Sequence, residues 1–179
     1  MAGRAVAVAV PVAIAVAVAA RSRGLVQRAQ STRLRRAMTI TRISPQEASQ
    51  KLADGWTYVD VRTVEEFEAG HPPGAVNVPI ALAGGGGMAP NPEFLGVMEA
   101  AFAKDAKIIV GCKAGGRSLR AAHELMAKGF SSVVDQRAGW DGGRDSFGQF
   151  EPGWSRVGLP SEQGQPAGRG WSDMRSKKK

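Results

Sequence analysis

The fold of this chain is decided by the stretch IIVGCKAGGRSLRAAHELMAK, residues 108–128. It opens with an apolar run that predicts a buried strand and passes through Cys112, the only cysteine among 179 residues. Two glycines follow, and then an amphipathic helix. A thiol at a strand-to-helix turn lies where backbone N–H groups converge and the helix dipole is positive. The stretch therefore predicts a loop that favours a thiolate and binds anions.

Strands and helices alternate on both sides of this loop. Besides the strand at 107–111, strands are predicted at residues 56–61, 75–78 and 132–134, and helices after Ser44 and at 64–69, 92–103 and 118–128. The glycine-rich segment 83–92 is expected to be a flexible surface loop. This alternation predicts an α/β fold with a central parallel sheet of about five strands and helices on both faces. Ligands of such sheets bind beyond the carboxyl ends of the strands, where Cys112 lies.

The positive charge of the chain is concentrated at its N-terminus. Residues 1–37 hold seven arginines and no acidic residue, whereas the rest carries a formal charge of only +1. The part after residue 37 thus lacks the basic stripe with interleaved aromatic residues that nucleic-acid binding requires, and no nucleic-acid partner is expected. The three C-terminal lysines are interpreted as part of a solvated, flexible basic tail over residues 161–179.

The N-terminal segment is typical of a targeting leader. Its Ala/Val run at 5–20 is too short and too weakly apolar to predict a stable membrane span. Arg21, Arg28 and Arg35 recur every seven residues and would share one helical face. We expect a removable transit peptide over residues 1–37, for the chloroplast ahead of the mitochondrion. A secretory signal, a bipartite leader and a low-complexity extension remain the alternatives, and residues 38–160 are predicted to form a single domain.

Metal and disulfide sites are not predicted. One cysteine excludes an internal disulfide and any cysteine-cluster metal site. The two histidines, His71 and His123, lie in different segments without metal-ligand spacing. No cofactor is expected.

The order and spacing of several short motifs resemble those of single-domain rhodaneses, the thiosulfate sulfurtransferase family, of plant, algal or bacterial type. The resemblance covers residues 41–160. Its parts are DVR at 60–62, EF at 66–67, GHPPGAVNVP at 70–79, CKAGGRS at 112–118, AA at 121–122, Leu125, GF at 129–130 and GW at 139–140. One departure is Ala138, which stands where the family usually has the first of two glycines and could perturb the packing of that turn.

The resemblance implies a sulfurtransferase in which Cys112 attacks a small anionic sulfur donor, becomes a persulfide and passes the sulfur to an acceptor. A thiol or cyanide is the expected acceptor, with thioredoxin and glutathione as candidates. Lys113 and Arg117 would bind the donor anion, and their charge favours thiosulfate over mercaptopyruvate. Gly115 and Gly116 would take positive φ so that N–H groups curl around the sulfur. Ala114 and Ser118 complete the predicted loop.

Five other residues are expected to have structural rather than catalytic roles. By the resemblance, Asp60 closes a strand beside the loop and pairs with an arginine, so that Asp60 and Arg62 are expected to support the site rather than to transfer protons. His71 is interpreted as a turn and packing residue, and His123 as a residue of the helix surface. Trp140 is expected to be a core anchor.

Two other functions are compatible with the motifs. Some relatives reduce arsenate or cleave phosphate, but they typically use a seven-residue loop, whereas Cys112 to Arg117 spans six residues. A non-catalytic interaction module is the third possibility, and inactive relatives often lack the cysteine that this chain retains.

Overall fold

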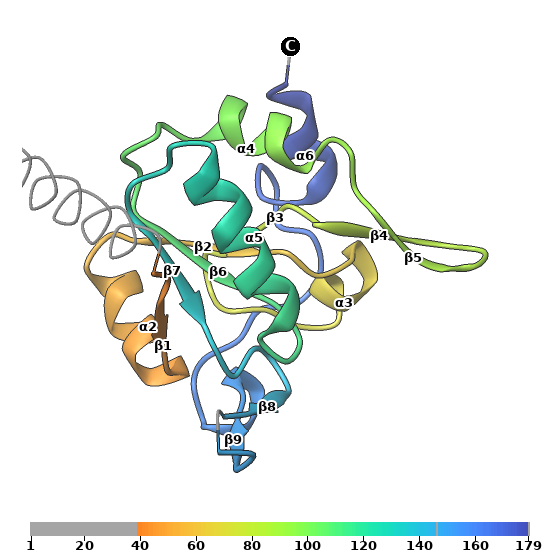
Figure 1. The fold of residues 1–179 in the computed structure, drawn as a ribbon. Helices are drawn as coiled ribbons and strands as arrows, with labels where there is room; N and C mark the ends of the chain where they lie inside the picture. Colours follow the sequence, from red (N-terminus) through yellow and green to blue (C-terminus); the bar gives the residue numbers. More distant parts are fainter. Residues whose placement is uncertain (1–38, 146, 179) are drawn as a thin grey trace, which may run out of the picture. The chain divides into compact units, whose positions relative to one another are not determined.

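The computed structural model describes residues 39–145 and 147–178. Among these residues, five parallel strands form a sheet in the order β1-β7-β6-β2-β3 (Figure 1). Their bounds are Thr41–Ile43 for β1, Thr57–Asp60 for β2, Val76–Asn77 for β3, Ile108–Gly111 for β6 and Val133–Gln136 for β7. The predicted α/β fold is confirmed, although β1 carries too little sequence pattern to be recognised as a strand. The expected leader over residues 1–37 lies outside the described residues.

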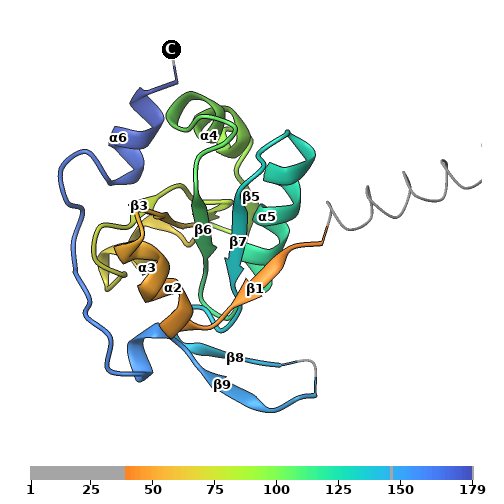
Figure 2. The ribbon, with the colours of Figure 1, turned by 90° about the vertical axis from the view of Figure 1, so that its left-hand side faces the viewer.

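Helices cover both faces of the sheet, as predicted (Figures 1 and 2). The bounds are Pro45–Ala53 for α2, Val64–Glu68 for α3, Phe94–Ala101 for α4, Gly116–Ala127 for α5 and Trp171–Ser176 for α6. Helices α2 and α3 both begin with a capping box, in which a Ser44 or Thr63 hydroxyl accepts from the backbone three residues on and a glutamate reaches back. These reciprocal bonds satisfy N–H groups that the helix itself leaves unpaired, so both starts are fixed locally.

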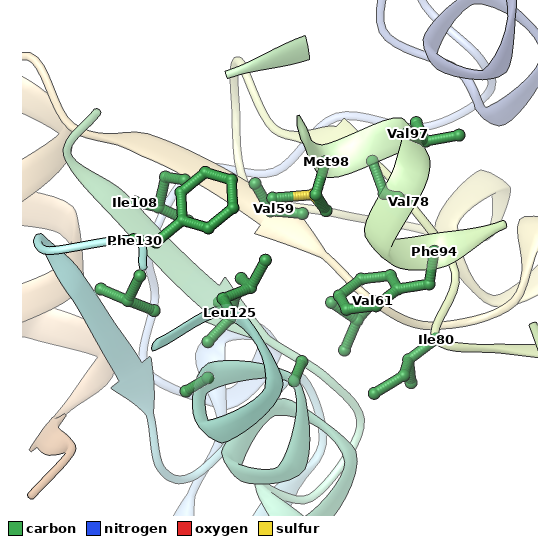
Figure 3. Packing of buried hydrophobic residues seen from close by; sticks show 14 of the residues in the cluster. Val59, Val61, Val78, Ile80, Phe94, Val97, Met98, Ile108, Leu125 and Phe130 are labelled. Atoms are coloured by element: carbon green, nitrogen blue, oxygen red, sulfur yellow. The ribbon is translucent and has the colours of Figure 1, made fainter. Parts of the chain in front are cut away.

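The core has two layers because successive strand residues point to opposite faces of the sheet. On one side, Ile108 and Val110 of β6 pack with residues of α4, α5 and α6, where Phe94, Met98 and Leu125 are almost wholly buried (Figure 3). On the other side, Ile109 of β6 packs with residues of α2 and α3, including Ala48 and Phe67. Both faces of β6 are therefore buried, and this packing on two sides fixes the position of the strand that leads into Cys112.

Two segments for which the sequence predicts no strand form antiparallel hairpins. Strands β4 (Ala81–Gly84) and β5 (Gly87–Pro90) pair within the glycine-rich segment, and β8 (Gly142–Arg144) pairs with β9 (Phe150–Pro152). The expectation of a flexible loop at 83–92 was therefore wrong in its secondary structure, although residues 83–90 are exposed. Pairing of the two strands, from Ala81 opposite Pro90 to Gly84 opposite Gly87, stabilises this hairpin, and the residue types alone do not predict it.

The segment after residue 160 packs on the domain instead of forming the expected flexible tail. The backbones of His71 and Glu162 exchange two hydrogen bonds of 2.9 Å, and Asn77 N donates to Arg169 O at 2.8 Å. Helix α6 then buries Met174 completely against the core. Apolar residues placed late in a Gly/Pro-rich stretch thus extend the domain beyond the predicted boundary at 160. Within the described part of the chain, no helix has the length and apolar character to span a membrane.

Candidate active site

Cys112 lies directly after β6, at the carboxyl end of the sheet, as predicted. Its neighbour Gly111 is in register with Asp60, the last residue of β2, and β7 ends on the other side of β6. Gly115 N donates to Cys112 Sγ at 3.1 Å, and Ser118 Oγ donates to the same sulfur at 3.3 Å. The thiol is only 2 % exposed. Two donors thus converge on a buried sulfur, an environment that suits a negatively charged sulfur atom.

Backbone hydrogen bonds join the loop to the segment that follows β7. Trp140 N donates to Cys112 O at 2.7 Å, and Asp141 N donates to Lys113 O at 2.9 Å. Gly139 has a φ of +67°, and a Cβ there would lie 2.5 Å from the carbonyl of Lys113. A glycine is therefore required where the two backbones meet. The buried Ala138 creates no strain, because no non-glycine residue of the described part of the chain has a positive φ.

The two glycines of the loop have different roles. Gly115 caps α5 with a φ of +85°, and a Cβ at this residue would collide with the carbonyl of Arg137. Gly116 is instead the first residue of α5 and has no positive φ, and a Cβ there would meet open space. The prediction of positive φ is confirmed for Gly115 and was wrong for Gly116, because α5 begins two residues earlier than the sequence pattern indicates.

Arg117 and Lys113, the expected anion-binding cations, each face a carboxylate. Arg117 Nη1 and Nη2 donate to Glu66 Oε2 and Oε1 at 2.6 and 2.8 Å, a bidentate pair between α5 and α3. Lys113 Nζ lies 3.7 Å from Asp141 Oδ2, and both of these side chains are exposed. The donor fork that the sequence assigns to an anion is thus already filled by Glu66. Ala114 lies in the same loop, with its carbonyl beside Gly143 of β8.

Asp60 and Arg62 form a buried ion pair beneath the loop. Arg62 Nη2 lies 2.6 Å from Asp60 Oδ2 and also donates to Gly70 O at 2.6 Å. The guanidinium carbon lies 5.1 Å from the centre of the Trp140 ring, within cation–π range. Burial disfavours the charged guanidinium, but Asp60 outweighs it and raises the pKa of Arg62. The pair therefore links β2 to the turn that fastens Cys112, in keeping with a supporting role.

Two carboxylates near the loop were not assigned a role from the sequence. In the sequence, Glu66 is recognised only as part of the EF motif at 66–67, and its pairing with Arg117 joins residues 51 positions apart. Asp135 on β7 is fully buried, receives a 2.7 Å hydrogen bond from Arg42 and lies close to Ser118. Burial raises the pKa of Asp135, although the hydrogen bond from Arg42 opposes this effect. Neither pairing leaves a local signal in the sequence. The first depends on how α3 and α5 pack, and the second on the pairing of β1 with β7, which places Arg42 opposite Asp135.

The histidines lie where the sequence predicts. His71 is fully buried and stacks on Phe67 with ring centres 3.7 Å apart, and its Nδ1 lies 2.8 Å from Phe67 O. His123 is exposed on α5. The described residues contain no group of three metal-binding side chains.

Comparison with known proteins identifies the family. Residues 44–145 match the Rhodanese-like domain family. "Thiosulfate sulfurtransferase 16, chloroplastic" of Arabidopsis thaliana is 39% identical over 120 residues, which cover 67% of this chain and 91% of that protein. "Thiosulfate sulfurtransferase 18" of the same plant is 36% identical over 107 residues, which cover 59% of this chain and 79% of that protein. The chain spans only a little over half the length of two further plant relatives, 53% and 58%.

A solved structure agrees with this assignment. The crystal structure of Rv0390 from M. tuberculosis superposes with a TM-score of 0.57 at 29% identity, covering 69% of this chain and 98% of that one. The family match covers the part of the chain that carries the Cys112 loop. The chain belongs to the rhodanese-like domain family.

Proposed function

We propose that this protein is a sulfurtransferase that moves a sulfane sulfur from thiosulfate to a thiophilic acceptor through a persulfide on Cys112. The observation that carries the proposal is the pair of donors, Gly115 N and Ser118 Oγ, on the sulfur of the only cysteine in the chain. Cys112 belongs to the apolar core cluster, as an inert buried thiol would, but its sulfur also accepts two hydrogen bonds. The relatives named thiosulfate sulfurtransferase support the same reaction.

The first half of the reaction is an attack of the Cys112 thiolate on the outer sulfur of thiosulfate. A new S–S bond forms to Cys112, and the S–S bond of the donor breaks, so that sulfite leaves with the electron pair. The donors from Gly115 and Ser118 would then face the persulfide, which carries the negative charge onward. The N-terminus of α5 adds a favourable dipole for anions at this position.

The second half returns the enzyme to its starting state. A nucleophilic acceptor, such as cyanide or the thiol of glutathione or thioredoxin, attacks the outer sulfur of the persulfide. The persulfide S–S bond breaks, and Cys112 leaves as a thiolate. Cyanide would yield thiocyanate and a thiol would yield a new persulfide, so that no external oxidant or reductant is required.

The experiment that tests the proposal is intact-mass measurement of the full chain after treatment with thiosulfate. The expected result is a mass increase of one sulfur atom, which cyanide removes with release of thiocyanate. Cys112→Ser should show neither the adduct nor thiosulfate:cyanide transfer while its circular dichroism spectrum stays unchanged. An unmodified Cys112 in the wild-type protein would instead favour a non-catalytic interaction module.

Arsenate reduction or phosphate cleavage is the competing enzymatic function. The six-residue loop from Cys112 to Arg117 favours sulfur transfer, because relatives that act on arsenate or phosphate typically use a seven-residue loop. Turnover of arsenate or of an aryl phosphate by the wild-type protein, at a rate exceeding that with thiosulfate, would reverse this assignment.

We also propose that the protein acts in the plastid. The arginine-rich, acid-free residues 1–37 support this location, as do relatives whose names place them in the chloroplast. Import of the full chain into isolated chloroplasts, with cleavage near residue 37, is the expected result. Import only into mitochondria would contradict the proposal.

A further inference from the structure

The bidentate ion pair between Glu66 and Arg117 occupies the donors that an anionic substrate would use. The pair is only partly exposed, 19% for the arginine side chain and 26% for the glutamate. A guanidinium presents its donors as a planar fork, and one carboxylate fills the fork completely along one edge. Met88 Sδ of the β4–β5 hairpin lies 3.6 Å from Arg117 Nη1 as well. Arg117 is therefore engaged on two sides.

Glu66 is held in this position by its own helix. Its Oε2 also accepts from the backbone N–H of Thr63 at 3.1 Å, which closes the α3 capping box. Burial opposes its ionisation, but the hydrogen bonds from Arg117 and Thr63 outweigh burial and lower the pKa of Glu66. Glu66 is thus a fixed negative charge at neutral pH. This charge repels an anion that approaches Arg117.

The second cation of the loop is opposed much more weakly. Lys113 and Asp141 are 3.7 Å apart and 58% and 42% exposed, so that water screens their attraction. The loop therefore offers one loosely paired cation and one that is tightly paired. The affinity for a doubly charged donor should depend mainly on the free energy needed to break the ion pair between Glu66 and Arg117.

We propose that Glu66 is a specificity-determining residue for the charge of the sulfur donor: its carboxylate fills the two-Nη edge of Arg117, and a dianion such as thiosulfate must displace it to bind along that edge. The inference rests on the proposed function, because thiosulfate is the donor of that reaction, and on the expectation from the sequence that Arg117 binds the donor. Glu66 raises the energetic cost of binding each negative charge of the donor. A donor with one charge fewer is penalised less.

The test measures binding separately from catalysis. Isothermal titration calorimetry would follow thiosulfate binding to the full-length Cys112→Ser protein, with and without Glu66→Gln. Glutamine keeps an acceptor for the Thr63 N–H but loses the charge. The expected result is roughly tenfold tighter binding for the double variant, the size of one charge–charge interaction in a half-buried site. Asp141→Asn should tighten binding by less than Glu66→Gln, because its pair is exposed.

The matched control is Glu47→Gln. Glu47 closes the equivalent capping box of α2, where its carboxylate accepts from Ser44 N at 2.7 Å, and it makes no contact with Arg117. This variant loses the same cap charge and should leave thiosulfate affinity unchanged. Equal, weaker or undetectable binding by the Glu66→Gln protein would overturn the proposal, since a residue that merely positions Arg117 would weaken binding when neutralised.

Donor selectivity provides the second readout, in the protein that retains Cys112. Glu66→Gln should raise kcat/KM for thiosulfate several-fold more than kcat/KM for methanethiosulfonate, which carries the same transferable sulfur but one charge fewer. An equal change for both donors contradicts a role in charge selection. If the wild-type protein forms no persulfide, the proposed function fails, whereas the calorimetric comparison still decides the role of Glu66.

Discussion

Ser118 Oγ lies 3.3 Å from Cys112 Sγ and donates a hydrogen bond to it from the first turn of α5. Ser118 is fully buried, so that this hydroxyl is shielded from competing water. A hydrogen bond to a charged acceptor contributes about 1.5–3 kcal/mol, more than a neutral one. In the sulfurtransferase proposed above, this contact would make Ser118 a direct stabiliser of the negatively charged sulfur and of the persulfide.

Replacing Ser118 with alanine should slow sulfur transfer without unfolding the protein. We expect kcat/KM for thiosulfate to fall by roughly tenfold, because the sulfur loses one of its two donors. The rate of thiocyanate formation measures this effect. Ser131→Ala is a suitable control, since the exposed Ser131 hydroxyl bonds only to Lys104 O. Equal rates for the two variants would remove Ser118 from the mechanism.

Alanine variants of Gly115 and Gly129 distinguish the cost of a steric clash from the cost of a positive φ. Both have a positive φ, +85° and +88°, but only at Gly115 would a Cβ collide with another group. Gly129→Ala should destabilise the protein by about 1–2 kcal/mol, the cost of a left-handed conformation in an alanine. Gly115→Ala should cost roughly 3–5 kcal/mol, because the carbonyl of Arg137 must also move.

Urea unfolding of these glycine variants gives the comparison directly. Gly116→Ala completes the series, since this residue is helical and its Cβ would meet open space. Its stability should be unchanged or up to about 1 kcal/mol higher, because alanine favours helix over glycine. Equal losses at 115 and 129 would show that the loop tolerates a shift of the Arg137 carbonyl.

The sequence was sufficient for the parts of the site that depend on local order. The apolar strand, the lone cysteine, the glycine turn and the helix follow one another, so their relative placement is set by chain connectivity. Asp60 was placed beside the loop through the resemblance, and the parallel register of β2 and β6 brings Asp60 opposite Gly111.

Features that depend on distant packing could not be predicted in this way. Strand β1 has three residues and gains its identity only from pairing with β7. The β4–β5 hairpin lies in a glycine-rich segment with no strand propensity, so its ladder depends on the pairing itself. Glu66 meets Arg117 only because α3 and α5 converge at the carboxyl end of the sheet. The packing of the C-terminal segment could not be predicted for a similar reason, because its backbone bonds to residues far away in the sequence, such as His71 and Asn77.

The stability of the protein in acid should report on Glu66. Because its pKa is lowered in the fold, its ionised form stabilises the protein fully above the unfolded pKa of about 4.3, and this contribution is lost as the pH falls through the folded pKa. The free energy of unfolding of the wild type should therefore exceed that of Glu66→Gln by a constant amount above about pH 5. The difference should shrink in more acidic solution. Urea titrations across this range measure it, and a difference that grows on acidification would contradict the assigned ion pair.

Met174 tests whether the C-terminal segment belongs to the domain. Its side chain has no exposed surface, and it packs in the same core cluster as Val76 and Val97. Met174→Ala removes buried apolar volume and should lower the free energy of unfolding by about 2–5 kcal/mol. Met88→Ala is the matched control, because Met88 is 59% exposed and should change stability by no more than about 0.5 kcal/mol. If both variants unfold at the same urea concentration, residues 161–178 form the loose tail that their composition predicts rather than a part of the core.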